Sequence, residues 1–430
     1  MELTAPAGLP ATDGVRTLAG AALTLVHTGQ APTRSALTSR LGVTRGTTGA
    51  LVGELRELGL IDVDTGPGPA GQQGRPSHRL LPAPGGPVAL AAQVHPDGFE
   101  VALVGLGGTV TARHGRDAPV PADPELALAP VAAAAAALLR ESGRQCVGAA
   151  VAVPTAVSRP AGAAVRALYV GWPTGAPVRD IFAAALAGHG VASQPAAGCA
   201  AVNDVNAVAL AEHRHGAGRG AGHLLVVAAG HRGVGGALVL RDALYTGATG
   251  LAMEAGHVSV DSGGLPCVCG NRGCLNVEAD VERFLALAGL GAAPGELASR
   301  QATAALRAGY PADDRVRSAA DAIADRLGLG LAGLINVVNP DLVLLGGLHG
   351  ELLAAAPGRL RAAVAAGSPW GASAVSGAAI PMEACALEHA GLIGAAEVAW
   401  QPVLDDPALL RTALPVAYTS LRVARLSTDS

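Results

Sequence analysis

Four side chains near the middle of the chain have the types and the spacing of a metal site. They are His257, Cys267, Cys269 and Cys274, and the three cysteines lie within residues 267–274. One imidazole and three thiolates fill all four positions of a tetrahedral zinc site and leave none for water. Glycines between the cysteines allow a short loop to wrap around one ion. We therefore predict that structural Zn²⁺ folds the loop 254–276. The alternative is three small core residues near an unrelated histidine.

The composition limits the class of protein that can surround this loop. The chain has 430 residues, half of them hydrophobic and only 2% aromatic, which predicts two or three domains with aliphatic cores. A net charge of −4 argues against nucleic-acid binding by the whole chain, but not by one domain. The other cysteines show no disulfide framework, the first residues do not resemble a secretory leader, and no apolar run is long enough to span a bilayer. We expect a cytoplasmic protein that is not attached to a membrane.

The first 82 residues are expected to form a winged helix-turn-helix domain. Gly42 separates two short helical segments, and Thr44 can cap the second of them. Two strand-like segments flank a Gly/Pro-rich stretch, as the strands of a wing do. The alternative is a small helical packing domain without a nucleic-acid partner. The expected helices lie at 15–27, 33–41 and 45–58, and the expected strands lie at 59–63 and 78–81.

Two parts of this domain are expected to contact double-stranded DNA. The start of the third helix makes base and phosphate contacts in such domains, and Arg45 there suits guanine, with a phosphate or solvent contact as the alternative. Arg75, on the stiff tip of the wing, suits the narrow and negatively charged minor groove. The predicted DNA-contacting residues are Thr44, Arg45, Thr47, Thr48 and Arg75.

Beyond a Pro/Gly-rich linker at 83–87, strand and helix patterns alternate from 88 to 405. A meander of strands is followed by alternating helix and strand, and this pattern occurs twice. It predicts two ribonuclease-H-like lobes of the α/β class, with a ligand site in the cleft between them. Strands are expected at 88–94, 99–104, 109–113, 147–153, 223–229, 235–240 and 342–345, and helices at 124–141, 204–215 and 314–329.

The chain resembles the ROK family (repressors, open reading frames and sugar kinases), and in particular its xylose-repressor-like transcriptional regulators. The cysteine cluster is the most specific part of the likeness, which covers nearly the whole chain to about residue 405. The resemblance implies a winged helix-turn-helix (1–82) followed by a two-lobed, actin/hexokinase-like ROK domain (88–405). The extension 406–430 has no counterpart in the family, and its role is open. Besides the cysteines, the likeness lies in Gly74–Ser77, Val202–Ala207, Gly233–His257 and Asn339–Gly347.

The resemblance also implies which residues bind a sugar. Asn203 and Asp204 match residues that hydrogen-bond the sugar in relatives, where the aspartate is the general base of the kinases. A carboxylate can accept the proton of a hydroxyl that attacks a phosphoryl group. Taken alone, both side chains would more simply cap the following helix; with the rest of the pattern we expect both roles. Glu254 and His257 match a sugar-contacting Glu-x-Gly-His, and a zinc-bound imidazole keeps its second nitrogen for a hydrogen bond.

Two positions depart from the family pattern. Asn276 stands where relatives carry a glutamate that touches the sugar, and an amide in place of a carboxylate removes a charge and adds donors. Thr155 stands where relatives usually carry glycine, which reshapes a nearby turn. We expect Asn276 to contact the ligand, whose identity as a sugar or a sugar phosphate stays open.

The sequence of the phosphate-binding loops distinguishes a regulator from a kinase in this family. In the family's kinases an Asp-x-Gly-Gly-Thr-like loop after the first strand cradles the phosphates of ATP, whereas this chain has Gln-Val-His-Pro-Asp-Gly at 93–98. The metal-binding aspartate is absent, and Pro96 has no amide proton to donate. The pair Gly107-Gly108 is best explained as a turn, while 233–236 keeps part of the second phosphate loop. We therefore predict no efficient ATP-dependent phosphorylation.

Three hypotheses for the function follow. The first is a sugar-responsive DNA-binding transcriptional regulator, most often a repressor in this family, whose ligand binds one lobe arrangement better than another. It would act as a homodimer or homotetramer on a pseudo-palindromic operator. The second is a ROK-type ATP-dependent sugar kinase with an added DNA-binding domain, in which Asp204 is the base. The third is a regulator that has lost sugar binding and responds to another protein.

Overall fold

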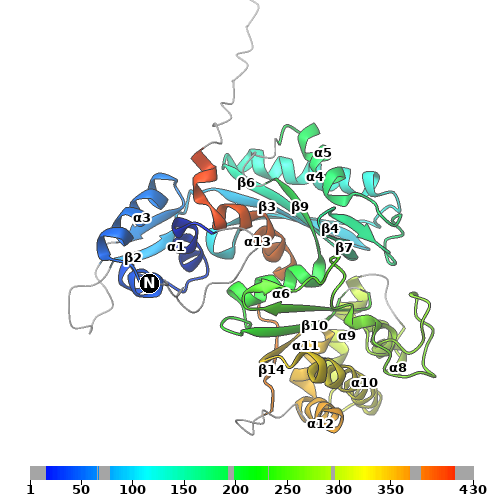
Figure 1. Cartoon of the computed structure of the whole chain (residues 1–430). Helices are drawn as coiled ribbons and strands as arrows, with labels where there is room; N and C mark the ends of the chain where they lie inside the picture. Colours follow the sequence, from blue (N-terminus) through cyan, green and yellow to red (C-terminus); the bar gives the residue numbers. More distant parts are fainter. Residues whose placement is uncertain are drawn as a thin grey trace, which may run out of the picture.

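The structure, a computed structural model, describes residues 16–64, 66, 78–191, 198–230, 232–291, 296–368 and 379–411. Figure 1 shows a small N-terminal domain beside two larger lobes, and helix α13 (Ala390–Asp405) lies between that domain and the sheet of the N-terminal lobe. Among these residues, no helix combines the length and the apolar character needed to cross a membrane.

The N-terminal domain has the three helices and the two-stranded wing that the sequence predicts. Helix α2 (Arg34–Leu41) ends at Gly42, whose φ of 65° is a left-handed conformation that glycine tolerates without strain. Thr44 then caps α3 (Arg45–Glu57) by accepting a hydrogen bond from the amide of Thr47. The tip of the wing, which carries Arg75, lies outside the described residues. The other elements are α1 (Leu18–His27) and the antiparallel pair β1 (Ile61–Asp64) and β2 (Arg79–Pro82).

The N-terminal lobe is built on a five-stranded sheet in the order β5-β4-β3-β6-β9. Its first three strands form the predicted antiparallel meander, and β6 and β9 add to it in parallel. Alternate residues of a strand face opposite sides of a sheet. In β3, therefore, Val88 and Leu90 pack in the core that contains residues of α4 and α5, whereas Ala89 and Ala91 pack in the core that contains α13. The bounds are β3 (Val88–His95), β4 (Gly98–Gly105), β5 (Thr109–Asp117), α4 (Pro124–Ser142), β6 (Cys146–Val153), β7 (Ala156–Ser158), β8 (Ala163–Val165), α5 (Val178–Gly188) and β9 (Cys199–Asn203).

The C-terminal lobe repeats the arrangement in the order β12-β11-β10-β13-β14. The sequence predicts the repetition and three of these strands, β10, β11 and β13. The long helix α10 (Asp314–Val338) passes the predicted end at 329 and stops at Asn339, which has a left-handed conformation. Gly328 within it lies against Ala363 of the later helix α12, where a side chain would clash. Helices α5, α7, α8, α9, α11, α12 and α13 were not predicted from the sequence. The bounds are β10 (His223–Ala229), β11 (Val234–Leu240), β12 (Ala243–Leu244), α7 (Leu275–Glu278), α8 (Val281–Leu287), α9 (Glu296–Gly309), β13 (Leu342–Gly347), α11 (Leu348–Ala355), α12 (Pro357–Gly367) and β14 (Met382–Ala384).

Helix α6 (Asp204–His215) lies between the two lobes (Figure 1). Its Ala207 belongs to the core around α13, whereas its Ala209 belongs to the core of β10, β11 and β13. Gly394 of α13 lets the two helices approach closely, because a side chain there would overlap with the backbone of Ala207. One helix is therefore packed against both lobes.

The N-terminal domain and the N-terminal lobe share one hydrophobic core. Leu23 and Leu55 of the domain are buried in the same cluster as Trp400 of α13, and the Trp400 indole donates to the Val104 carbonyl at 3.1 Å. At the end of α13, the carbonyl of Asp405 accepts a hydrogen bond from the amide of Thr17, at the start of α1, at 2.9 Å. The domain is thus docked on the lobe along its whole first helix.

The segments on either side of the lobes support this docking. The predicted linker 83–87 is a turn in which the Gly86 carbonyl accepts a hydrogen bond from Arg144 at 2.7 Å. The role of the extension 406–430 could not be predicted, and its first residues form the short helix η3 (Pro407–Arg411). There Leu410 joins the shared core, and Arg411 pairs with Glu54 of α3 at 3.2 Å.

Candidate metal centre and ligand cavity

The structure brings His257, Cys267, Cys269 and Cys274 together. Their ligand atoms all lie within 4.8 Å of one another. The Sγ atoms of Cys269 and Cys274 are 3.7 Å apart, and Cys267 Sγ lies 3.7 Å from His257 Nδ1. Two such atoms bound to one tetrahedral Zn²⁺ ion at about 2.0–2.3 Å would lie roughly 3.5–3.8 Å apart. The four residues therefore form a Cys₃His cluster whose spacing fits a closed zinc site.

The loop that carries this cluster is held in place by its neighbours. The backbone at Gly273, with φ of 61°, lies so close to the carbonyl of Asp261 that a side chain would overlap with it. Asp261 in turn pairs with Arg326 of α10 at 2.7 Å. The buried Glu278 accepts a hydrogen bond from the amide of Leu265 at 2.7 Å. These contacts attach the loop to the C-terminal lobe.

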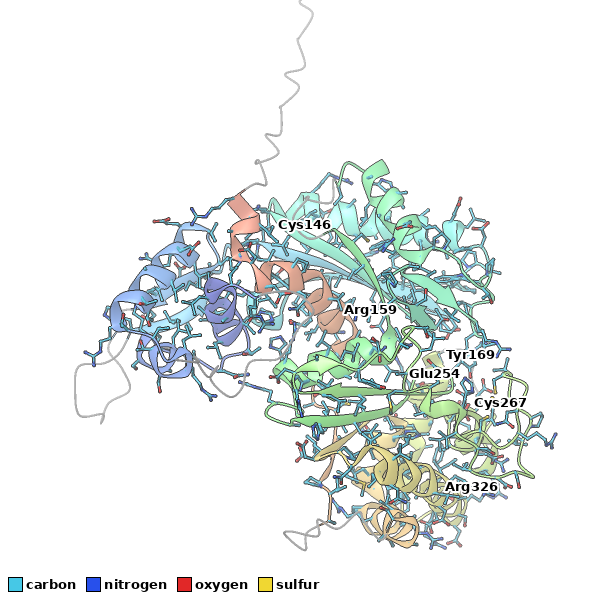
Figure 2. The ribbon with its side chains drawn as sticks, in the orientation of Figure 1. Cys146, Arg159, Tyr169, Glu254, Cys267 and Arg326 are labelled. Carbon is cyan, nitrogen blue, oxygen red and sulfur yellow. The ribbon has the colours of Figure 1, made fainter. Side chains whose placement is uncertain are left out.

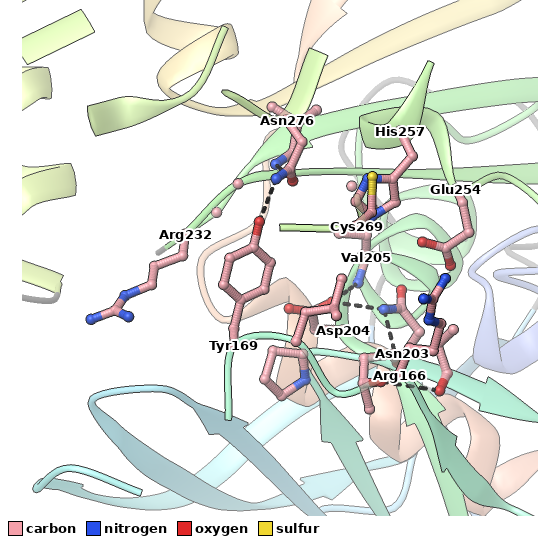
Figure 3. A pocket seen from close by; sticks show the side chains of 18 of the residues that line it. Arg166, Tyr169, Asn203, Asp204, Val205, Arg232, Glu254, His257, Cys269 and Asn276 are labelled. Carbon is pink, nitrogen blue, oxygen red and sulfur yellow. Dashed lines mark hydrogen bonds between the residues drawn. The ribbon is translucent and has the colours of Figure 1, made fainter. Parts of the chain in front are cut away.

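A cavity of about 260 Å³ opens beside this cluster, between the two lobes. Asn203, Asp204, Glu254, His257 and Asn276, the five predicted sugar-binding residues, all line it (Figure 3). Because Nδ1 of His257 faces the thiols, the other ring nitrogen is left for the cavity side. The cavity has the size of a small ligand and combines acceptors on the carboxylates with donors on the amides and the imidazole.

Asn203 and Asp204 do cap α6, as their types allow. Oδ1 of Asn203 accepts a hydrogen bond from the amide of Asn206 at 3.0 Å, and Oδ1 of Asp204 accepts one from the amide of Val205 at 2.8 Å. The amide of Asn203 also donates to the carbonyl of Thr155 at 3.2 Å. The backbone carbonyl of Thr155 thus helps to fix the orientation of Asn203. The two side chains combine a capping role with a place in the cavity wall.

Burial raises the pKa of Asp204 to about 6, and the nearby negative charge of Glu254 contributes to the rise. Burial also raises the pKa of Glu254. A carboxylate with this pKa is mostly ionised at neutral pH and is a good acceptor for a hydroxyl group. The two acids therefore form the acceptor side of the cavity.

Tyr169 is a cavity residue that the sequence analysis missed. It lies after β8 in the N-terminal lobe, and its hydroxyl accepts a hydrogen bond from the side-chain amide of Asn276 in the C-terminal lobe (Figure 3). Burial raises the pKa of Tyr169 to about 12, so the hydroxyl keeps its proton and can donate a hydrogen bond to a ligand. No sequence motif marks this tyrosine; its partner lies more than a hundred residues away.

The side chain of Asn276 is already engaged within the protein. Its Oδ1 accepts a hydrogen bond from the amide of Val234 at 2.9 Å, and its Nδ2 donates to Tyr169 and lies 3.9 Å from the sulfur of Cys267. Figure 2 shows Tyr169, Glu254 and Cys267 near one another at this edge of the cleft. Asn276 therefore joins the metal loop, the glycine-rich turn before β11 and the opposite lobe.

The two phosphate-loop regions lie at the same cavity. His95 and Pro96, at the position of the first loop, line it, as do Gly233 and Val234 of the second. The amide of Val234 is occupied by Asn276, and a side chain at Gly233 would overlap with Asn276 and Tyr169. A backbone donor that could have faced a phosphate is thus used to hold the cavity wall.

The predicted DNA-contacting residues of α3 differ in exposure. Arg45 is exposed, and Thr44 and Thr47 pair their hydroxyls at 2.9 Å at the helix start. Thr48 is only 1% exposed, and its hydroxyl lies 2.9 Å from that of Thr38 in α2. Thr48 therefore holds α2 against α3 rather than presenting a hydroxyl at the surface. Arg75 lies outside the described residues.

The fold and the cleft define a class of two-lobed, actin/hexokinase-like proteins that carry an N-terminal winged helix. Residues 94–401 match the ROK family, and the chain belongs to that family.

Individual relatives include both regulators and kinases. The chain is 38% identical over 153 residues to a putative xylose repressor of Caldicellulosiruptor sp. (strain Rt8B.4), which covers 34% of this chain and 38% of that protein. It is 35% identical over 158 residues to a glucokinase of Thermotoga maritima, which covers 34% of this chain and 49% of that enzyme. The matched part spans less than half the length of each of these curated relatives.

Solved structures extend the likeness in fold. A ROK family transcriptional regulator, described as a homolog of the E. coli MLC protein, has a TM-score of 0.68 at 21% identity and covers 92% of this chain and 98% of its own. A ROK family glucokinase from Streptomyces griseus, in complex with glucose and AMPPNP, has a TM-score of 0.60 at 23% identity and covers 73% and 99%.

Proposed function

We propose that this protein is a sugar-responsive DNA-binding transcriptional repressor. The observation that carries the proposal is that a winged helix-turn-helix domain shares one hydrophobic core with a two-lobed domain whose cleft holds a polar cavity. A ligand that prefers one arrangement of the lobes can alter DNA affinity only if the two parts move together. A docked domain meets this requirement better than one on a flexible linker.

The cavity suits a monosaccharide or a small sugar phosphate. Asp204 and Glu254 would accept hydrogen bonds from sugar hydroxyls, and Tyr169 would donate one. His257 would contribute its outward nitrogen once Nδ1 is bound to Zn²⁺. When present, the ion would neutralise the thiolates and fix this loop; it has no open position at which to activate water. We assign Asn276 the role of holding Tyr169 in place.

DNA binding would use the exposed start of α3, with Arg45 reading a base and Thr44 and Thr47 near phosphates. Arg75 on the wing remains our choice for the minor groove. Two such domains in a homodimer would read paired half-sites of an operator.

The alternative function, an ATP-dependent sugar kinase, is supported by the glucokinase relatives and by Asp204 in the cavity. Against it stand Pro96 in place of a phosphate-loop amide and the use of the Val234 amide by Asn276. We therefore favour the regulator.

The test combines two assays on the purified full-length protein. In vitro selection from random duplex DNA is expected to recover a pseudo-palindromic sequence. D-xylose, D-glucose and N-acetyl-D-glucosamine are then tested for heat on titration and, with ATP, for ADP release in a coupled assay. We expect at least one sugar to bind without turnover. ADP release that is abolished by Asp204→Asn would instead identify a kinase.

A further inference from the structure

Helix α6 connects the ligand cavity with the N-terminal domain. Its first turn carries Asp204 in the cavity, and its last residue is His215. The His215 ring meets that of His27 in α1 edge to face, with centroids 4.9 Å apart. A helix of 12 residues is a rod about 18 Å long. One helix therefore spans the distance from the cavity to the domain that carries α1.

At the far end of α6, three donors surround one buried carboxylate. The Glu397 side chain of α13 has no exposed surface. Its oxygens lie 2.8 Å from Nε2 of His27, 2.8 Å from Nε2 of His215 and 2.6 Å from the Arg214 guanidinium. Burial alone would raise the pKa of Glu397, but the donors that surround it, with the Arg214 guanidinium among them, bring it well below its ordinary value. One charged carboxylate thus joins the N-terminal domain, α6 and α13.

The position of the proton on His27 follows from a hydrogen bond with the backbone of Gly107. The amide of Gly107 donates a hydrogen bond to Nδ1 of His27 at 2.9 Å. That nitrogen therefore carries no proton, and Nε2 donates its own to Glu397. A metal ion on Nε2 would put a proton on Nδ1, facing the Gly107 amide. Although His27, His215 and Glu397 have the residue types of a metal site, this geometry makes them a hydrogen-bonded cluster.

The last turn of α6 is also attached to the C-terminal lobe. His213 lies 2.7 Å from Asp242 in the turn between β11 and β12. Glu212, which is fully buried, accepts hydrogen bonds from the amides of Ala386 and Leu387, just before α13, at 2.8 Å each. A change in the angle between the lobes would therefore pull on the same helical turn that holds Glu397.

We propose that Glu397, His27, Arg214 and His215 are positioning residues that couple the ligand state of the cavity to the orientation of the DNA-binding domain. The proposal rests on the proposed function. In this protein we assign the buried cluster the role of fixing one arrangement of the three elements that it joins. Its loss should therefore uncouple the two sites before it prevents either from binding.

The decisive variant is Glu397→Gln, which keeps the size of the side chain and removes its charge. The full-length protein is bound to the DNA fragment obtained by in vitro selection, and the three sugars named above are the probes. We expect a sugar Kd within about 2-fold of wild type, whereas the sugar-induced change in DNA affinity falls from about 10-fold to less than 2-fold. His215→Gln, which acts on the same carboxylate from a partly exposed position, should change it in the same direction and serves if Glu397→Gln does not fold.

Arg411→Gln is the matched control. It breaks the Arg411–Glu54 pair across the same domain boundary without touching α6, and it should leave the sugar response intact. An undiminished response in folded Glu397→Gln and His215→Gln would overturn the proposal. An equal loss in Arg411→Gln would also overturn it, because the cause would then be general loosening of the boundary.

A second measurement does not depend on finding a ligand. In the ligand-free protein, Glu397→Gln should accelerate amide hydrogen exchange both in α1 and at the cavity end of α6, residues 203–206, at least several-fold over Arg411→Gln. Unchanged exchange at 203–206 would refute the coupling. If no sugar binds wild type but this pattern is found, the proposed effector fails while the coupling stands.

Discussion

The ligand cavity and the boundary between the N-terminal domain and the lobe are built in opposite ways. The cavity wall includes a candidate metal site from one short loop, with Cys267, Cys269 and Cys274 close in sequence. The boundary joins residues that are remote in sequence: His27 and Glu397 are 370 positions apart. The first region is partly open to solvent, whereas both of these side chains have no exposed surface. Local chemistry can thus be read in a sequence, whereas the connection that gives it a regulatory effect lies in long-range packing.

The largest effect is expected from a substitution in the candidate metal site. Cys274→Ser deletes one of four ligands, so the protein should lose stoichiometric Zn²⁺ and about 10 °C in Tm. Elemental analysis and calorimetry measure both. Cys146→Ser is the control, because burial raises the pKa of Cys146 to about 11 and Figure 2 places it far from Cys267. Wild-type protein without bound metal, or a Cys274→Ser variant of unchanged Tm, would remove the centre from the account.

The domain boundary should respond next most strongly. Trp400→Ala empties a fully buried site and leaves the Val104 carbonyl without its donor, which should cost about 3–5 kcal/mol. Because the core is shared, the N-terminal domain and the N-terminal lobe should unfold in one transition in wild type, and that transition should move as a whole. Calorimetry and near-ultraviolet dichroism measure the unfolding. Separate unfolding of the N-terminal domain in wild type would contradict a shared core.

Asp204→Asn probes the cavity through pH. The pKa of Asp204 is raised from 3.8 to about 6 in the folded protein, so ionisation costs stability, and the cost appears as pH rises from 4 through 6. The variant should be more stable than wild type at pH 7.5, by on the order of 3 kcal/mol, and equal to it near pH 4, while losing sugar affinity. Urea unfolding at both pH values measures the difference. A gain in stability at pH 4 instead of pH 7.5 would refute the assignment.

The smallest effects are expected in α3, where they distinguish a residue that contacts DNA from one that packs against α2. Arg45→Ala should weaken binding to the selected DNA by roughly 10-fold with unchanged Tm, because the side chain is exposed. Thr48→Val should instead lower stability by about 1 kcal/mol, since the Thr48 hydroxyl is bonded to Thr38 and to the Thr44 carbonyl. Fluorescence anisotropy and calorimetry distinguish them. Equal behaviour of the two variants in both assays would contradict the separate roles of Arg45 in DNA contact and Thr48 in packing.

The sequence predicted the features that depend on local patterns and missed those that depend on long-range packing. The three helices of the N-terminal domain, the wing, the two meanders and helices α4, α6 and α10 were predictable, because apolar period and turn glycines are short-range signals. The cysteine cluster is a local pattern too, whereas the other residues around the cavity were predicted from the resemblance to the ROK family. Tyr169 was missed, and Asn276 was assigned to the ligand, because only the folded chain shows that the two bind each other across the cleft. Thr48 has the type and place of a DNA contact, but α2 covers it.

The docking of the N-terminal domain was not predictable for the same reason. Residues 83–87 have the composition of a linker, and nothing local indicates that Leu23, Leu55 and Trp400 fill one core. The helix α13 that makes this core follows the entire C-terminal lobe in sequence. Its return to the N-terminal lobe is a property of the two-lobed topology rather than of its own residues.

The central claim is that a ligand in the cleft controls DNA binding by the docked domain. The most direct measurement is the affinity of the full-length protein for its selected DNA with and without a saturating sugar that it binds, in the absence of ATP. The account predicts a change of about 10-fold that Glu397→Gln abolishes. A sugar that binds in the cavity but leaves DNA affinity unchanged in wild type would contradict it.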